Sequence, residues 1–281
     1  MAYTLKDIAA MSMGHQVALM NSLFTRKLGD APAGSQNAIN QHSYTVSEWG
    51  ETKEALEHSY VSDELRDGIA DMFTTLIGSI WRAGNTEMFL FLADQSYVQR
   101  QNLGSQNNLT TTEAKLVLDD IEVIVSDTSK LLSLTGDNSI SNNLLHRQLN
   151  RLAIKLFEFS LFIGINPHAD LSQVTMANLS KLCQGRSCLE RTYEKYADIG
   201  VQLYHTEVEP DVYAVFSKEH QVGTDGKTYE ADKFLKSADW FEPFFPSLTT
   251  DSALAHANVS AAVIQATPKV DLVDGNGNPL I

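Results

Sequence analysis

The stretch from Gly68 to Trp81 contains a single charged residue, Asp71, and its other side chains are apolar, small or hydroxyl-bearing. A helix of this composition is apolar on nearly all sides and must be enclosed by other elements. Long helical patterns with short polar connections surround it, and we predict helices over 8–28, 46–59, 64–82, 87–101, 112–134, 143–162 and 168–183. This succession is typical of a helical bundle.

The pattern changes after Gly185. A helix is predicted over 188–199, followed by a β-hairpin formed by 201–208 and 212–216 and by a turn at Asp225-Gly226. The polar residues 30–43 are predicted to form a loop, and the aromatic segment 240–246 is expected to cover part of the protein. The expected fold class is therefore mainly α. An all-α bundle occupies 1–185, a small α+β C-terminal appendage with strands occupies 186–250, and 251–281 form a loosely ordered tail.

Composition argues against several classes of protein. The 281 residues include 21 Lys and Arg against 35 Asp and Glu, which gives a formal charge of −14. An acidic surface does not suit nucleic-acid binding through phosphates, and no segment approaches the ~18 apolar residues of a membrane span. The N-terminus lacks the layout of a signal peptide, and Cys183 and Cys188 are too few for a disulfide framework, so we expect a cytoplasmic protein. An acidic protein that acts on a polyanion needs metal ions between the two.

Paired carboxylates on two consecutive helices are the candidate site. Glu51 and Glu54 lie three residues apart on one helix, and Asp67 and Asp71 lie four apart on the next. Helices joined by a short loop pack as antiparallel neighbours, so these acids can converge. A lone carboxylate in the apolar helix around Asp71 is costly unless it is paired or bound to a metal. Oxygen ligands favour Mg²⁺, with Mn²⁺ as the alternative, so these four residues are the predicted metal ligands.

Two other acids allow a second assignment of the ligands. Glu48 follows Thr45 by three residues, and a capping box at the start of the helix would explain both. Glu64 falls in the first turn of its helix, where the macrodipole favours an anion. The set Glu48, Glu51, Glu64 and Asp67 therefore remains an alternative to the set that ends at Asp71. A solvent-exposed helix face remains the alternative explanation for Glu51 and Glu54.

These pairs resemble the signature of the all-α nucleoside triphosphate pyrophosphohydrolases, the superfamily of MazG, the phosphoribosyl-ATP pyrophosphohydrolases and the dimeric dUTPases. That signature is E-x-x-E on one helix and E-x-x-D on the next, with apolar residues after the final Asp. Glu51-x-x-Glu54 resembles its first half, and the run after Asp71 resembles its end. Gly68 stands where the family has glutamate, and Asp67 is the expected replacement.

Further segments resemble phage-encoded MazG-like proteins. They are Gly164-Ile-Asn-Pro167, Asn178-x-Ser180-Lys181, Val215-Phe-Ser217, Asp225-Gly-Lys227-x-Tyr229 and Lys233-Phe-Leu-Lys236-Ser237. The resemblance covers most of residues 10–246, apart from 87–142. If the protein is phage-encoded, its expected location is the host cytoplasm.

The resemblance implies Mg²⁺-dependent hydrolysis of a nucleoside triphosphate between its α and β phosphates, with Glu51 or Glu54 as the base. It implies that Asn178 and Lys181 hold phosphate or sugar, that Lys233 and Lys236 close over the triphosphate, and that the chain forms a homodimer or higher homo-oligomer. Two alternatives stay open. One is a non-catalytic helical interaction module that retains the fold, and the other is a pyrophosphatase specific for dUTP or dCTP.

Overall fold

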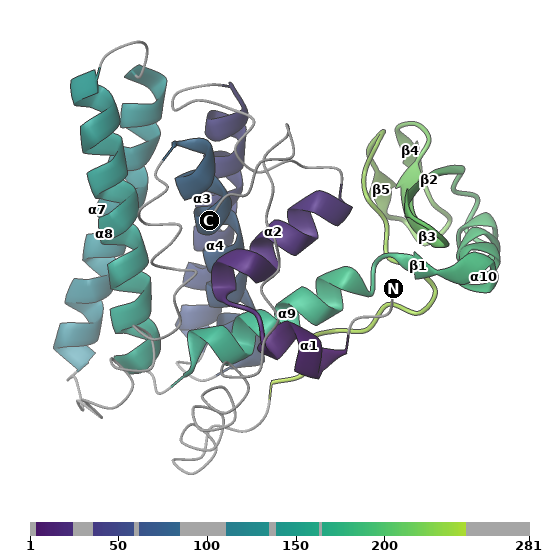
Figure 1. The fold of residues 1–281 in the computed structure, drawn as a ribbon, viewed down its shortest axis with the longest axis horizontal. Helices are drawn as coiled ribbons and strands as arrows, with labels where there is room; N and C mark the ends of the chain where they lie inside the picture. Colours follow the sequence, from purple (N-terminus) through teal and green to yellow (C-terminus); the bar gives the residue numbers. More distant parts are fainter. Residues whose placement is uncertain are drawn as a thin grey trace.

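The protein is mainly helical in the computed structural model, which describes residues 4–24, 36–58, 62–84, 111–134, 139–162 and 165–245. These residues form eight helices and a small antiparallel strand region near the C-terminus, as predicted (Figure 1). The helices are α1 (Leu5–Ala9), α2 (Met13–Leu23), α3 (Gln36–His58), α4 (Asp63–Arg82), α7 (Thr111–Leu134), α8 (Ser139–Phe162), α9 (Pro167–Leu179) and α10 (Gly185–Ala197).

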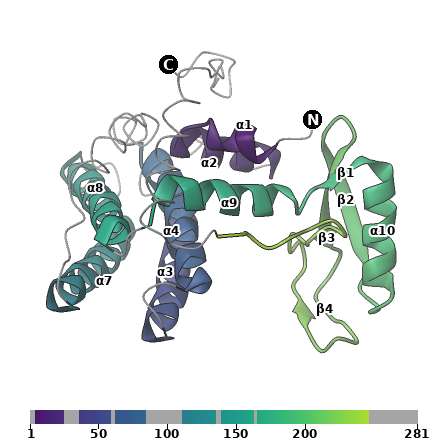
Figure 2. The same cartoon turned by 90° about the horizontal axis from the view of Figure 1, so that it is seen from below.

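Helix α4 lies at the centre of the bundle. It packs along α3 on one side and against α8 and α9 on others, while α7 and α8 pair at the edge farthest from the strands (Figure 2). Apolar side chains of α4 such as Phe73, Leu76 and Ile77 are fully buried, as the composition of this stretch requires. One continuous core runs from α1 to α9 and reaches Val212 and Ala214 of the appendage, so the strands pack on the bundle.

Capping residues set the helix starts. The Ser62 hydroxyl accepts from the backbone N–H of Leu65 at 3.1 Å, so α4 begins close to its predicted start. Ser12 caps α2 through the N–H of His15, so two helices, α1 and α2, replace the single helix predicted over 8–28, of which residues 25–28 lie outside the described part. Asn166 caps α9, whose first residue Pro167 is preset for a helical φ.

The predicted loop over 30–43 is wrong at its C-terminal end, because α3 already begins at Gln36. Two polar residues in this first part of α3 are buried and form hydrogen bonds to other helices. His42 is buried and approaches the Val125 carbonyl and the Ser129 hydroxyl of α7, and Gln41 donates to the Thr75 carbonyl of α4. Composition alone therefore misplaced the start of this helix by three turns.

The appendage consists of α10 and two small sheets. Strands β1 (Cys183–Gln184), β2 (Leu203–Glu209) and β3 (Val212–Ser217) form an antiparallel sheet in the order β1-β3-β2. The β2–β3 hairpin confirms the predicted one, and Asp211 takes the positive φ of its turn. Strands β4 (Gln221–Val222) and β5 (Thr228–Tyr229) enclose the predicted turn at Asp225-Gly226. The helix predicted over 168–183 ends earlier, at Leu179, and its last predicted residue, Cys183, begins β1.

Two of the predicted segments are not covered by the described ranges. The helix predicted over 87–101 and the tail over 251–281 lie outside the described residues. In the ranges that the structure does describe, no helix is both long and apolar enough to cross a membrane.

A buried ion pair joins α4 to α9. The Arg66 guanidinium donates from Nε to Asp170 Oδ2 at 2.9 Å and from Nη2 to Asp170 Oδ1 at 2.6 Å, and both side chains are almost fully enclosed. The Phe245 ring lies over the guanidinium at 5.0 Å and is itself buried against Ala70 and Val174. Part of the aromatic segment 240–246 thus covers this pair, as expected.

Helices α3 and α4 approach closely at Gly68. A Cβ on Gly68 would lie 2.7 Å from Thr52 Oγ1 and 3.3 Å from Thr52 Cα, distances that leave no room for a side chain. A second close approach occurs at Gly78, where a Cβ would lie 3.0 Å from the Gln41 amide. At Gly68 the α3 backbone lies directly on α4, whereas at Gly78 the space is filled by the Gln41 side chain.

Replacement Asp170→Ala should lower the free energy of unfolding by about 3–5 kcal/mol, because it leaves the Arg66 charge buried without its partner. Urea unfolding followed by circular dichroism measures this. The control is Glu230→Ala, which breaks the exposed His220–Glu230 pair and should change stability by less than about 1 kcal/mol. Equal effects of the two replacements would show that the buried pair has no special role.

Gly68→Ala should destabilise the protein by about 1–2 kcal/mol, since the added methyl must push α3 and α4 apart. Gly50→Ala is the matched control in α3, because a Cβ there meets nothing within 4 Å. It should stabilise the protein by about 0.5–1 kcal/mol through helix propensity. Thermal unfolding of both variants tests the crossing, and a stabilised Gly68→Ala would contradict it.

Candidate metal and phosphate site

Four carboxylates converge where α3 packs on α4, and they are Glu48, Glu51, Asp67 and Asp71. The charge of Glu51 and that of Asp67 act on Glu48, and those of Asp67, Glu48 and Glu51 act on Asp71. Two of the four come from each helix, and the close crossing at Gly68 holds the helices together there. The group therefore combines one pair from each of the two assignments considered from the sequence.

Glu48 is an interior residue of α3, so its explanation as part of a capping box is wrong. The helix begins nine residues before Thr45, and the Thr45 hydroxyl is buried with no hydrogen-bond partner among the described residues. The Glu48 carbonyl accepts from Thr52 Oγ1 at 2.7 Å, as in a continuous helix. The Glu48 side chain lies one turn before Thr52, which faces α4, and therefore points toward the same crossing.

Glu54 and Glu64 lie apart from this group. Glu54 follows Thr52 by two positions, which turns it to the opposite side of α3, and its side chain is exposed. Glu64 is exposed in the first turn of α4 beside the Ser62 cap, which agrees with its macrodipole explanation. The structure thus brings Glu51, Asp67 and Asp71 of the predicted ligands together, with Glu48 in the place expected for Glu54.

Burial raises the pKa values of the deeper carboxylates. It is the largest cause of the pKa of about 7 at Glu48, and the charges of Glu51 and Asp67 add to it. The pKa of Asp71 is raised well above its usual range, first by burial and then by the charge of Asp67. The pKa of Asp67 is also raised by burial. A crowded group of acids in a low-dielectric environment has this property.

Lys181 is the cation that faces the group. Its charge acts on Glu48, Asp67 and Asp71, while burial lowers the pKa of Lys181 itself. Lys181 Nζ also donates to Asn178 Oδ1, so these two predicted substrate-binding residues form one unit at the C-terminal end of α9. Lys181 lies near the carboxylates because α9 packs on α4, where Arg66 pairs with Asp170.

A second lysine is brought in by the segment 235–245, here called the strap, which returns from the appendage to the bundle (Figure 2). The Ser237 hydroxyl donates to the Ser180 carbonyl at 2.7 Å, and the N–H of Phe241 donates to the Ser180 hydroxyl at 3.2 Å. These bonds hold the strap beside Lys181. Lys236 lies on it, with Nζ 3.3 Å from the centre of the Trp240 ring.

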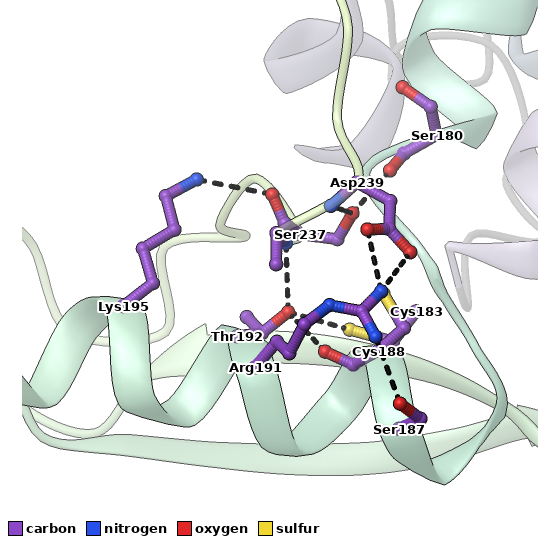
Figure 3. Close-up of polar contacts among 10 residues, drawn as sticks. Ser180, Cys183, Ser187, Cys188, Arg191, Thr192, Lys195, Ser237 and Asp239 are labelled. Atoms are coloured by element: carbon purple, nitrogen blue, oxygen red, sulfur yellow. Dashed lines mark hydrogen bonds and ion pairs between the residues drawn. The ribbon is translucent and has the colours of Figure 1, made fainter.

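Helix α10 anchors the other side of the strap (Figure 3). Arg191 donates to both Asp239 oxygens at 2.7 Å, Lys195 Nζ donates to the Ser237 carbonyl at 3.1 Å, and Thr192 Oγ1 accepts from the N–H of Ala238 at 2.9 Å. Thr192 also contacts the thiol of Cys183, whose pKa burial raises to about 12. Both cysteines are buried free thiols.

Lys236 and Glu242 place charge at the edge of the carboxylate group. Burial and the charge of Lys181 lower the pKa of Lys236, while Glu242 raises it. Glu242 also acts on Asp67. Lys233, predicted to act with Lys236, is exposed near β5, and its backbone bonds to Ser217 and Glu230. Lys236 therefore lies beside the carboxylates, and the charge of Lys233 is not among those that act on them.

The chemistry of the carboxylates fits a divalent cation. No hydrogen bond from a described residue supports the Asp71 carboxylate, and Lys181 alone cannot neutralise four acids. As the side chains stand, no three Asp, Glu, His or Cys residues of the described ranges form a ready-made metal site. Glu48 and Glu51 have flexible side chains on the accessible side, so rotation of these two toward Asp67 and Asp71 would supply the remaining oxygens.

The departure from the family signature at Gly68 has a steric cause. Position 68 faces the Thr52 backbone, and a glutamate there would overlap α3. Asp67, one residue earlier, turns its carboxylate toward the accessible edge of the crossing. The residues missed from the sequence are Arg66 and Asp170, since a contact between distant segments leaves no local pattern.

Comparison with known proteins identifies no relative. No protein-family model matches the chain, and no curated protein and no solved structure is significantly similar to it. The resemblance to the all-α nucleoside triphosphate pyrophosphohydrolases therefore rests on its motifs alone.

The contribution of Glu48 to the stability of the protein should fall as the pH rises from about 4.5 to about 7, opposite in sign to that of His42, whose pKa is lowered by burial to about 4. Glu48 has a higher pKa in the folded state than in the unfolded one, so the folded state binds more protons across this range, and the stabilisation is lost as the pH passes the folded value. Glu48→Gln should reduce this slope and stabilise the protein at pH 8, by about 1–2 kcal/mol after allowance for screening by water.

Urea unfolding at a series of pH values measures the effect. Glu54→Gln is the matched control, since Glu54 is exposed on the opposite side of the same helix. A slope that Glu48→Gln leaves unchanged would contradict the burial of this carboxylate.

Proposed function

We propose that the protein is a Mg²⁺-dependent nucleoside triphosphate pyrophosphohydrolase, which cleaves the α–β phosphate bond and releases the nucleoside monophosphate and pyrophosphate. The observation that carries the proposal is the convergence of Glu48, Glu51, Asp67 and Asp71 on one side of Lys181. This arrangement combines ligands for divalent cations with a cation for phosphate, as a polyphosphate substrate requires. The family resemblance supplies the reaction.

Each residue of the site has a distinct proposed task. Asp67, Asp71, Glu48 and Glu51 would hold Mg²⁺, which when bound would offset phosphate charge and polarise the attacked phosphorus. Glu51 is the most exposed of the four and would accept the proton of the attacking water. Lys181 would bind a phosphate oxygen while Asn178 orients its ammonium group, and Lys236 would reach the phosphates from the strap.

A second candidate function is a non-catalytic helical interaction module. The observation that favours it is Lys181, which already lies against the carboxylates as a counter-charge in place of a metal. In that case Lys181 would serve to stabilise the fold. A pyrophosphatase specific for dUTP or dCTP is the narrower form of the enzymatic proposal. An assay with a panel of nucleoside triphosphates distinguishes it from an enzyme of broad specificity.

Asp71→Asn should reduce Mg²⁺-dependent turnover by at least about a hundredfold, because it removes one charged ligand from the most buried position. The assay incubates the protein with a panel of ribo- and deoxyribonucleoside triphosphates and measures pyrophosphate and orthophosphate separately. We expect pyrophosphate, and we expect chelation of the metal to stop its release.

Glu54→Gln is the control for this prediction and should retain most of the activity, since Glu54 faces away from α4. Circular dichroism and thermal unfolding show whether Asp71→Asn keeps the fold. A wild-type protein that hydrolyses none of the nucleotides would refute the enzyme and leave the interaction module. Activity that survives Asp71→Asn would refute this assignment of the site.

A further inference from the structure

Four lysines come together where the strap passes the appendage, and they are called the lysine group here. They are Lys181 just after α9, Lys195 of α10, Lys227 in the turn between β4 and β5, and Lys236 of the strap. Among the described residues, none of the four has a carboxylate within ion-pair distance. Such a group of unpaired cations stands out in a chain with a formal charge of −14.

Hydrogen bonds fix the turn that carries Lys227. Asp225 Oδ1 accepts from the Lys227 N–H at 3.1 Å, and Asp225 Oδ2 accepts from the Tyr229 hydroxyl at 2.9 Å. Gly226 between them has a φ of 77°, which a glycine adopts without strain. Both oxygens of Asp225 are thus engaged within the turn, while the Lys227 side chain is exposed.

Tyr196 of α10 connects this turn to the strap. Its ring lies edge-on to the Tyr229 ring with centroids 5.9 Å apart, and its hydroxyl donates to the Lys236 carbonyl at 3.2 Å. Lys195 Nζ lies 5.4 Å from the centre of the same Tyr196 ring and donates to the Ser237 carbonyl (Figure 3). The turn, α10 and the strap are therefore held around one buried tyrosine.

Lys236 links the appendage lysines to the carboxylate group. Its charge acts on Asp67, and burial followed by the charges of Lys181, Lys227 and Lys195 lowers its own pKa. In Figure 2, β4 and the far end of α3 extend from the level of the strap in the same direction. The lysine group thus continues the proposed site from the bundle to the appendage.

Little negative charge offsets the appendage side of the lysine group. Glu242 raises the pKa of Lys236, but Asp239 is held by both of its oxygens to Arg191 and adds no net charge. Lys195 uses one donor on a carbonyl and keeps two others. Lysine ammonium groups with free donors are ligands for phosphate oxygens.

We propose that Lys195, Lys227 and Lys236 bind the pyrophosphoryl end of a linear polyphosphate whose cleaved bond lies at the carboxylates. The inference rests on the proposed function for the position of that bond, and it deepens that function by assigning the end of the phosphate chain. When water attacks the α phosphorus, the bond to the bridging oxygen breaks and its electron pair leaves with pyrophosphate. The three lysines neutralise the charge of this leaving group. A shorter chain leaves them without a phosphate, so affinity rises with chain length.

The test is the binding of inorganic orthophosphate, pyrophosphate and tripolyphosphate, measured by isothermal titration calorimetry in a Mg²⁺ buffer of low ionic strength. The wild-type protein should bind tripolyphosphate at least about tenfold more tightly than orthophosphate. Lys227→Gln should weaken tripolyphosphate binding by about three- to tenfold, and Lys227→Glu by more, because both remove an exposed cation from the end of the chain. Lys130→Gln replaces an exposed lysine of α7, far from the appendage, and should change nothing.

A nucleoside triphosphate with a methylene bridge between its α and β phosphorus atoms, titrated alongside, identifies the source of the chain. Tighter binding of this analogue than of tripolyphosphate identifies a nucleotide, and the reverse identifies inorganic polyphosphate. Both results support the proposal when Lys227→Gln weakens the binding. Circular dichroism shows that the variants are folded.

Two results would overturn the proposal. One is an affinity for tripolyphosphate no greater than that for orthophosphate, and the other is an affinity that neither Lys227 variant reduces. The outcome is distinguishable from that of the proposed function. A protein that binds tripolyphosphate through Lys227 but hydrolyses no nucleotide retains the phosphate-binding lysines and is not the enzyme. Turnover of nucleotides together with unchanged binding in Lys227→Gln retains the enzyme and refutes the role of the lysines.

Discussion

The ion pair between Arg66 and Asp170 fixes the position of α9 on α4, and through it the positions of Lys181 and the strap beside the proposed site. It is bidentate and shielded from water, and together with apolar contacts such as that between Ala70 and Val174 it holds α9 at one position on α4. Because α9 crosses α4 at that point, the residues just beyond its C-terminus reach the carboxylates of α3 and α4. The strap then returns along the same path, and its final aromatic ring covers the guanidinium. The helix crossing, the position of Lys181 and the path of the strap are therefore linked to this contact.

The proposed site shows how an acidic protein can present a surface to another anion. Its carboxylates are gathered at a crossing where a glycine removes the space between two helices, and their own repulsion favours any cation that enters. Lys181 occupies that role in part, and it comes from an element distant in sequence. The raised pKa values of Glu48 and Asp71 follow first from burial and then from the charges of the neighbouring carboxylates. A bound divalent ion would reverse them, since it would favour the ionised forms.

Local sequence was sufficient for much of the fold. The apolar run around Asp71 predicted a buried central helix, and the hairpin around Pro210 was placed almost to the residue. The start of α3 was missed because its first turns are polar, and this error led to the capping explanation for Glu48. The close approach at Gly68 and the partnership of Arg66 with Asp170 could not be predicted, because each depends on a residue from a different segment. Glu54 was included because spacing along a helix does not reveal which side faces a neighbour.

The strap has a consequence for how the molecule is made. Its last described residue, Phe245, contacts a helix that ends at Arg82, so the N-terminal helices leave the ribosome long before the segment that closes over them is synthesised. Until then, Arg66 lacks its aromatic cover and Lys236 is missing from the edge of the carboxylate group. A nascent chain that stops before the strap lacks both Lys236 and the aromatic cover of Arg66, so the proposed site is complete only once these residues have been synthesised.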